Sequence, residues 1–174
     1  MDAHEHGVGE LNIAFDGGTV AMEFHAPGAD IVGFEYKAES EEDRAAIEAA
    51  VATLARPLDL FVLPGSAECT IVQASAELEG EEHHDHEEHG EGEDHSDHDD
   101  HAEDHHDDEA RHTEFHAEYE LTCARPEAIS DITFVYFDAF ANARELEVQI
   151  VTASGAQAFE VKRDAPKLDL RGMF

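Results

Sequence analysis

One stretch near the middle of the chain constrains the fold more than any other. The 29 residues from Glu81 to Glu109 hold 16 acidic residues and nine histidines, and the other four are glycine, serine or alanine. Such a stretch has no large apolar side chain to bury, so nothing offsets the entropy lost on ordering it. We therefore predict a long disordered loop, rich in His, Asp and Glu. A loop of this length inside a compact domain is uncommon and usually functional.

The remainder of the chain is expected to form one globular domain. The 174 residues carry a formal net charge of −33, and 41% of them are hydrophobic. We predict a single zinc-binding domain over residues 1–174, with residues 81–109 as an acidic, histidine-rich metal-binding insertion. With only 10 Lys and Arg, the chain has too few cations to bind nucleic acid or an anionic membrane surface. No apolar run approaches the length needed for membrane insertion.

Outside the insertion, apolar and polar residues alternate in many segments, which is the pattern of half-buried strands. The expected strands cover residues 11–15, 20–24, 69–78, 115–123, 146–150, 159–161 and 168–170. The first two flank Asp16-Gly17-Gly18, which indicates a hairpin. One clear helix is expected: Ser40 with Asp43 forms an N-cap pair, and Ile47, Val51 and Leu54 share a helical face before Pro57. The predicted fold class is α+β, with a mainly antiparallel β-sheet and one solid helix.

Two cysteines, Cys69 and Cys123, lie on expected strands that flank the insertion. If these strands pair as a long hairpin, a disulfide would close a loop of 54 residues at its base. The alternative is a pair of buried free thiols that act as small hydrophobic residues. A disulfide would imply an oxidising compartment such as a bacterial periplasm. Met1 runs directly into Asp2-Ala3-His4, with no signal peptide, and we interpret it as a start placed on a mature N-terminus.

The nine histidines of the insertion are spaced to converge on metal ions. They are His83, His84, His86, His89, His95, His98, His101, His105 and His106. Zinc takes about four nitrogen, sulfur or oxygen ligands, so this set with its carboxylates could hold several zinc ions and order on binding them. Cu²⁺ or Ni²⁺ would also bind such ligands in vitro, whereas Ca²⁺ would not use the histidines. The surrounding carboxylates should raise the histidine pKa values, so zinc affinity should fall as the pH drops.

Five histidines lie outside the insertion: His4, His6, His25, His112 and His116. His4 and His6 share one side of an extended segment, and the Gly17-Gly18 turn brings His25 opposite residues 9–10. A small site from His4, His6 and His25, with Glu23, is one interpretation. His116 lies on the polar face of its strand, and His112 precedes it. Each is also compatible with an ordinary surface or core histidine, and His25 and His116 are the best candidates for an ordered metal site.

These features together resemble the ZrgA-like family of periplasmic zinc-binding proteins from Gram-negative bacteria, over nearly the whole chain. The matching segments are residues 4–12, residues 25–35, the central His/Asp/Glu loop, His116 with Tyr119 and Cys123, residues 134–140 and residues 146–149. Asp30 stands where the family pattern leads us to expect Asn or a similar residue. The resemblance implies a zinc-regulated periplasmic protein that supports high-affinity import beside an ABC transporter and its solute-binding protein.

Three functional hypotheses follow. In the first, the chain is a zinc carrier or buffer, a metallochaperone of zinc homeostasis, whose core folds without metal. In the second, it is a metal sensor or interaction module whose loop orders on zinc binding. In the third and weakest, it is a zinc-dependent hydrolase, although no His-Glu-x-x-His helix, Gly-x-Ser-x-Gly elbow or phosphate loop is present. Zinc could also cross-link two flexible loops and give a zinc-dependent dimer.

Overall fold

The computed structural model describes residues 6–80 and 113–173. The predicted insertion, with its nine histidines, lies outside the described residues, as do His4 and His112. The strands are β1 (Val8–Asp16), β2 (Thr19–Pro27), β3 (Phe61–Val62), β4 (Cys69–Glu79), β5 (Glu114–Cys123), β6 (Asp131–Phe134), β7 (Glu145–Thr152), β8 (Gly155–Lys162) and β9 (Lys167–Asp169). The helices are α1 (Gly28–Ile31), α2 (Glu41–Leu54), α3 (Pro57–Leu60) and α4 (Tyr136–Ala139), with 3-10 turns at Gly65–Ala67 and Pro126–Ala128.

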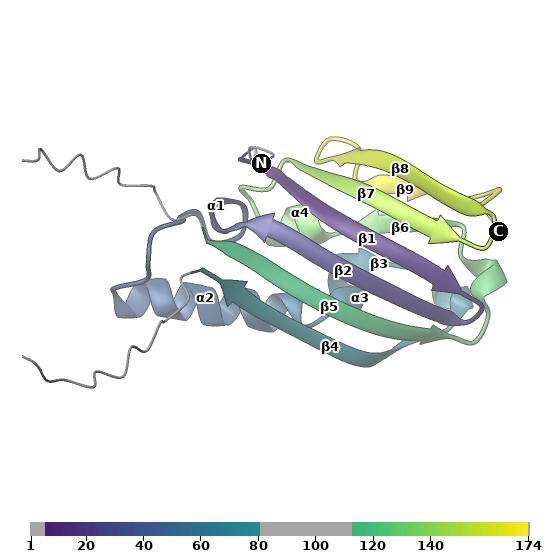
Figure 1. Ribbon diagram of the computed structural model, residues 1–174, viewed down its shortest axis with the longest axis horizontal. Helices are drawn as coiled ribbons and strands as arrows, with labels where there is room; N and C mark the ends of the chain where they lie inside the picture. Colours follow the sequence, from purple (N-terminus) through teal and green to yellow (C-terminus); the bar gives the residue numbers. More distant parts are fainter. Residues whose placement is uncertain (1–5, 81–112, 174) are drawn as a thin grey trace, which may run out of the picture.

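Six strands form the main sheet, in the order β4-β5-β2-β1-β7-β8. All its neighbouring strands are antiparallel except β1 and β7, which run parallel. Helices α2, α3 and α4 and the small sheet β3-β6-β9 lie behind this sheet, and its other face is turned toward the viewer in Figure 1. The predicted α+β class, with one long helix and mostly antiparallel strands, is confirmed. The parallel pair was not predicted, because alternation along a strand carries no information about the direction of its neighbour.

The β1–β2 hairpin forms where the Gly17-Gly18 signal predicts it. Gly17 has a φ of +58°, in the left-handed region that glycine adopts without steric cost because it has no Cβ. The register pairs Asp16 with Thr19 at the turn and places Glu10 opposite His25 near the other end. The predicted position of His25, opposite residues 9–10, is therefore confirmed.

The long helix α2 begins at the predicted cap, where the backbone N–H of Asp43 donates to the Ser40 hydroxyl at 3.1 Å. Its far end is tied to the main sheet, because the Tyr119 hydroxyl donates to the backbone oxygen of Leu54 at 2.6 Å. Burial of that phenol raises the pKa of Tyr119 well above the ordinary tyrosine value. The helix thus covers the inner face of β4 and β5 and leaves their outer face open.

The core lies between the main sheet and the layer behind it. Inward residues of the strands are buried, among them Leu11, Ile13, Phe24 and Leu121. Phe24 packs edge-on against Tyr136, with ring centroids 5.4 Å apart, and both rings belong to a larger aromatic cluster. Because alternate residues of each strand are committed to this core, the residues between them must face outward.

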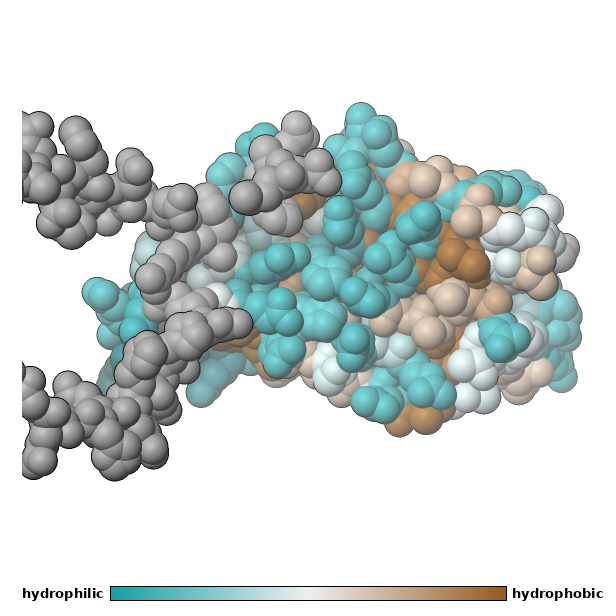
Figure 2. Space-filling model, viewed as in Figure 1, coloured by the Kyte–Doolittle hydropathy of each residue, from teal (hydrophilic) through white to brown (hydrophobic). Residues whose placement is uncertain are grey.

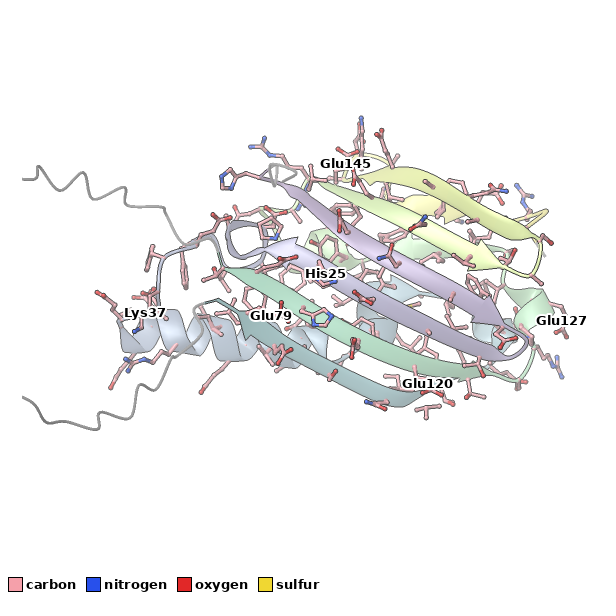
Figure 3. The ribbon with its side chains drawn as sticks, viewed as in Figure 1. His25, Lys37, Glu79, Glu120, Glu127 and Glu145 are labelled. Carbon is pink, nitrogen blue, oxygen red and sulfur yellow. A yellow bond between two sulfur atoms is a disulfide. The ribbon has the colours of Figure 1, made fainter. Side chains whose placement is uncertain are left out.

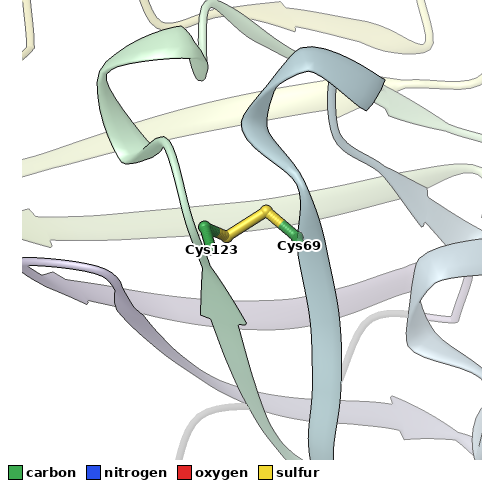
Figure 4. Close-up of a disulfide and its surroundings, with 2 residues drawn as sticks. All are labelled: Cys69 and Cys123. Carbon is green, nitrogen blue, oxygen red and sulfur yellow. A yellow bond between two sulfur atoms is a disulfide. The ribbon is translucent and has the colours of Figure 1, made fainter.

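A disulfide joins Cys69 to Cys123, so the predicted disulfide is confirmed and the alternative of two buried free thiols is wrong. The bond links the first residue of β4 to the last residue of β5, which face each other in the register (Figure 4). The two strands therefore form the predicted long hairpin, closed covalently at the end away from the insertion. None of the described helices is long and apolar enough to cross a membrane.

Candidate metal site

The ordered candidate site lies on the outward face of the main sheet, at the end nearest the insertion. His25 on β2 and His116 on β5 face each other directly across the two strands. Their rings stack with centroids 4.5 Å apart, and their side chains keep only 25% and 17% of their surface exposed. The sequence identifies both residues, but it does not show that they form a pair, because it does not show that β2 and β5 are neighbours.

The pair belongs to a row that crosses all six strands of the main sheet. Its members are Glu77, His116, His25, Glu10, Glu147 and Glu160, each opposite the next. We call this the histidine row. Figure 3 shows His25 on the open face of the sheet and Glu79 on the edge strand β4, with β5 between their two strands. This end of the face is strongly hydrophilic in Figure 2, whereas the opposite end carries apolar surface.

Glu23 joins the two histidines into a ligand group. One ligand atom from each of Glu23, His25 and His116 lies within 4.8 Å of the others. The Glu23 carboxylate accepts a hydrogen bond from His25 Nε2 at 2.7 Å and lies 4.0 Å from His116 Nε2. Both imidazoles thus turn their Nε2 atoms toward one carboxylate, which is the donor set of many three-ligand zinc sites.

The opposite nitrogens of the two rings also face carboxylates. His25 Nδ1 lies 3.3 Å from Glu114, and His116 Nδ1 lies 3.3 Å from Glu79. A carboxylate on the far nitrogen of a metal-binding histidine fixes its tautomer and orientation and strengthens it as a ligand. A neutral ring that keeps its proton on Nδ1, toward these acids, offers its Nε2 lone pair to an ion on the Glu23 side; at His25 the ion would replace the proton that Nε2 donates to Glu23.

An unsatisfied polar atom supports this interpretation. His116 Nε2 is buried and has no hydrogen-bond partner among the described residues, since Glu118 lies 3.8 Å away and Glu23 lies 4.0 Å away. A buried ring nitrogen without a partner costs free energy, and a bound cation would remove that cost. Zinc bonded at about 2.0–2.1 Å to each nitrogen would take Glu23 as its third ligand, with Glu118 within reach as a fourth.

The local charges favour protonated His25. Burial opposes protonation, but the hydrogen bond to Glu23 and the charges of Glu114, Glu23 and Glu10 outweigh it, so the pKa of His25 is raised. The pKa of Glu23 is lowered, chiefly by its hydrogen bond with His25. Zinc must displace the His25 proton, so affinity at this site should fall with decreasing pH.

A second group adjoins the first and shares His116. Glu77 and Glu79 on β4 place their carboxylates 3.7 Å and 3.3 Å from His116 Nδ1, and the three residues also meet the 4.8 Å condition. No pattern in the sequence marks these two glutamates as ligands. Counting back from Cys69 and Cys123 would put Ala76 opposite His116, but an irregularity between Ile71 and Gln73 shifts the register and puts Glu77 there.

The predicted cluster of His4, His6 and His25 stays a prediction, because His4 lies outside the described residues. His6 lies beside Glu35, with His6 Nδ1 3.4 Å from the carboxylate, and neither ligand group contains it. His4 and His112 lie outside the described residues, so their proposed roles stay predictions. The nine histidines of the insertion stay predictions for the same reason.

Asp30 is a second titratable feature at this end of the molecule. It lies in α1, directly after β2, and is only 1% exposed. One carboxylate oxygen accepts the backbone N–H of Gly7 at 2.6 Å, while the other has no hydrogen-bond partner among the described residues. Burial raises the pKa of Asp30 to about 6. The carboxyl therefore ties the start of β1 to the end of β2.

Comparison with known protein families fits this fold and donor set. A family model described as "ZrgA family zinc uptake protein" matches residues 3–170. The match places this sheet protein, with its ordered His/Glu group, in the class of zinc uptake proteins. The chain belongs to the ZrgA family, which confirms the resemblance seen in its sequence. None of the curated proteins compared with the chain matches it.

Proposed function

We propose that this protein captures zinc and delivers it to the solute-binding protein of a zinc ABC importer, and that it buffers zinc between the two events. The observation that carries the proposal is the group formed by Glu23, His25 and His116. Membership of a zinc uptake family makes zinc the expected ion. The histidine-rich insertion would add further zinc sites, so several ions per chain are expected from the sequence.

The position of the group favours exchange over permanent storage. Three protein ligands leave a fourth coordination position of zinc, which Glu118 or an incoming ligand from an acceptor can take. The group lies on the open face of the sheet, and Glu23 is half exposed. A hollow of about 430 Å³ reaches it across the same face, bordered by Asn12, Ala21, Glu23 and Glu118. An acceptor could approach the ion through this hollow and replace one ligand at a time.

We place this activity in the periplasm. The Cys69–Cys123 disulfide is typical of oxidising compartments, and a zinc uptake family is expected to act outside the cytoplasm. The proposal includes no nucleic-acid partner, because the net charge of −33 opposes binding to phosphate backbones. Zinc-dependent dimerisation, and binding of Cu²⁺ or Ni²⁺ in vitro, stay predictions from the sequence.

Transfer separates the carrier from its two alternatives. The intact chain would be loaded with zinc and mixed with the zinc-free solute-binding protein of a zinc importer. The proteins would then be separated and their zinc measured. A carrier transfers zinc faster than it loses zinc to a chelator of matched affinity. A sensor keeps its zinc and changes only its affinity for the partner, and a hydrolase shows zinc-dependent ester or peptide cleavage.

Two variants identify the contribution of the sheet site. His25→Gln combined with His116→Gln should remove the zinc fraction that this site transfers. Glu147→Gln is the matched control, because Glu147 is an exposed member of the same histidine row on β7, outside both ligand groups. Equal transfer from all three proteins would show that the sheet site has no part in delivery.

A further inference from the structure

The His116 side chain is the shared member of both ligand groups. Its Nε2 faces Glu23 and Glu118 at 4.0 Å and 3.8 Å. Its Nδ1 faces Glu79 and Glu77 at 3.3 Å and 3.7 Å. We call Glu23, His25 and His116 the inner group, and Glu77, Glu79 and His116 the outer group. One imidazole ring thus stands between two candidate metal positions.

The chemistry of imidazole makes these two positions alternatives. A neutral ring has a proton on one nitrogen and a lone pair on the other, so it binds one metal ion. Zinc on Nδ1 leaves the proton on Nε2, and zinc on Nε2 leaves the proton on Nδ1. Occupation of both positions at once would require the ring to lose its second proton as well.

The two groups differ in exposure and in ligand type. Glu77 and Glu79 are 68% and 52% exposed and lie on β4, which is the edge strand that leads into the insertion. The inner group has two imidazoles that are 25% and 17% exposed. Imidazole suits zinc better than carboxylate does. The outer group is therefore the more accessible and weaker position, and the inner group is the more protected and tighter one.

We propose that the outer and inner groups are consecutive positions for a single zinc ion, with His116 as the ligand common to both. Zinc arrives at Glu77, Glu79 and His116 Nδ1, and then moves to Glu23, His25 and His116 Nε2. The His116 ring loses its proton from Nε2 and gains one at Nδ1, so its net charge is unchanged. The proton that zinc displaces from His25 Nε2 passes to solvent. In the final state Glu79 accepts the Nδ1 proton and orients the ring. This inference rests on the proposed function, because it describes how the sheet site is filled.

Histidine-ring NMR tests the order of the two positions in the full chain. Rings labelled with ¹⁵N report which nitrogen carries the metal and which carries the proton. The chain would be titrated with zinc alone until the spectrum stops changing. In the unmodified protein, His25 and His116 should both be metallated at Nε2. His25→Gln removes one inner ligand, and it should shift the metal on His116 from Nε2 to Nδ1.

Two further variants make the result decisive. Glu23→Gln removes a different inner ligand and should produce the same shift to Nδ1, and the backbone amide spectrum shows that each variant is folded. Glu147→Gln should behave like the unmodified chain. The proposal is overturned if His116 is metal-free or stays metallated at Nε2 in both inner-group variants. It is also overturned if both His116 nitrogens carry zinc in the unmodified chain. By contrast, metal-free His25 and His116 at saturation would overturn the sheet site of the proposed function itself.

Discussion

The two ends of the main sheet are held together by different chemistry. At one end, the Cys69–Cys123 disulfide joins β4 to β5, and the backbone N–H of Cys123 donates to the Gly18 oxygen at 2.7 Å. At the other end, His25 stacks on His116, and the buried Asp30 holds Gly7. We call these the disulfide end and the histidine end. Neither a disulfide nor a backbone hydrogen bond titrates near neutral pH, whereas at the histidine end the pKa of His25 is raised and the pKa of the buried Asp30 is raised to about 6.

The outward residues follow the same division. Toward the disulfide end, a row of Gln73, Glu120, Ala21, Ala14, Val151 and Ala156 crosses the sheet in the same way as the histidine row. Glu120 is labelled in Figure 3, away from His25 and Glu79. The same backbone therefore offers the same cross-strand pairs at both ends, and the side chains alone decide which end can bind a cation. The strand register places the side chains opposite one another at both ends, and the histidine row carries two imidazoles at these positions.

The largest expected effect comes from breaking the disulfide end. Cys69→Ala with Cys123→Ala releases a loop of 54 residues, which should lower the free energy of unfolding by about 4 kcal/mol. The loss should be equal at pH 5 and pH 8, and zinc binding by His25 and His116 should be retained under folding conditions. Urea denaturation at both pH values measures the first, and histidine-ring NMR measures the second. A loss that changes with pH would contradict the division between the ends.

Asp30→Asn should stabilise the protein at neutral pH. The folded pKa of Asp30 is about 6 against an ordinary 3.8, so the folded state keeps a proton that the unfolded state has lost. Native stability should therefore fall, relative to the variant, as the pH rises from about 4 to 6, by at most about 3 kcal/mol. Above pH 6 the difference should be constant. Denaturation of both proteins between pH 4 and pH 8 checks this, and a constant difference over the whole range would refute it.

His116→Gln should weaken zinc binding at the sheet site at least about a hundredfold, since it removes a direct ligand of both groups. Competition with a chromophoric chelator measures the tightest site of the intact chain. Glu160→Gln is the control, because Glu160 is an exposed residue of the histidine row on the far strand β8. Equal affinities for the two variants would remove His116 from the ligand set.

The pH should have a smaller and graded effect on the same site. Because the pKa of His25 is raised, its proton competes with zinc at and below neutral pH. The apparent zinc affinity should fall by up to about tenfold per pH unit once His25 is protonated. Glu114→Gln removes one charge that raises this pKa, so the fall should begin at a lower pH. Chelator competition from pH 5.5 to pH 8 follows both curves, and coincident curves would show that Glu114 has no influence.

The smallest effect is a gain of binding at the disulfide end. Ala21 and Glu120 face each other as His25 and His116 do, and Glu23 and Glu118 flank both pairs. Ala21→His with Glu120→His should create a new zinc site, about tenfold or more weaker than the native one because Glu79 and Glu114 have no counterparts there. Ring NMR of the two new histidines detects the ion. Rings that stay metal-free at saturating zinc would show that register and carboxylates are insufficient.

The sequence predicts the elements well because its local signals are strong. Gly17-Gly18, the Ser40 cap and the alternation from Phe115 to Cys123 each specify a structure from neighbouring residues. The cysteines add one long-range contact, because a disulfide fixes which strands lie together. The fold class follows from these signals alone.

The site needed information that local patterns do not carry. Pairing of His25 with His116 depends on β5 lying beside β2, which is a tertiary contact between residues 91 positions apart. Glu77 and Glu79 reach His116 only through an irregularity in β4. Asp30 shows the same limit, since its sequence position reveals neither its burial nor its bond to Gly7. The ligand types are visible in the sequence, and the strand order determines which of them meet.

The most direct test of the account is to locate zinc on the folded sheet. Crystals of the intact protein grown with zinc would be measured on both sides of the zinc absorption edge, so that anomalous scattering identifies the ion. The account predicts a zinc peak about 2.0–2.1 Å from the Nε2 atoms of His25 and His116, with a Glu23 oxygen as the third ligand. Zinc found only elsewhere, with both Nε2 atoms free of metal, would contradict the claim that the sheet carries its own zinc site.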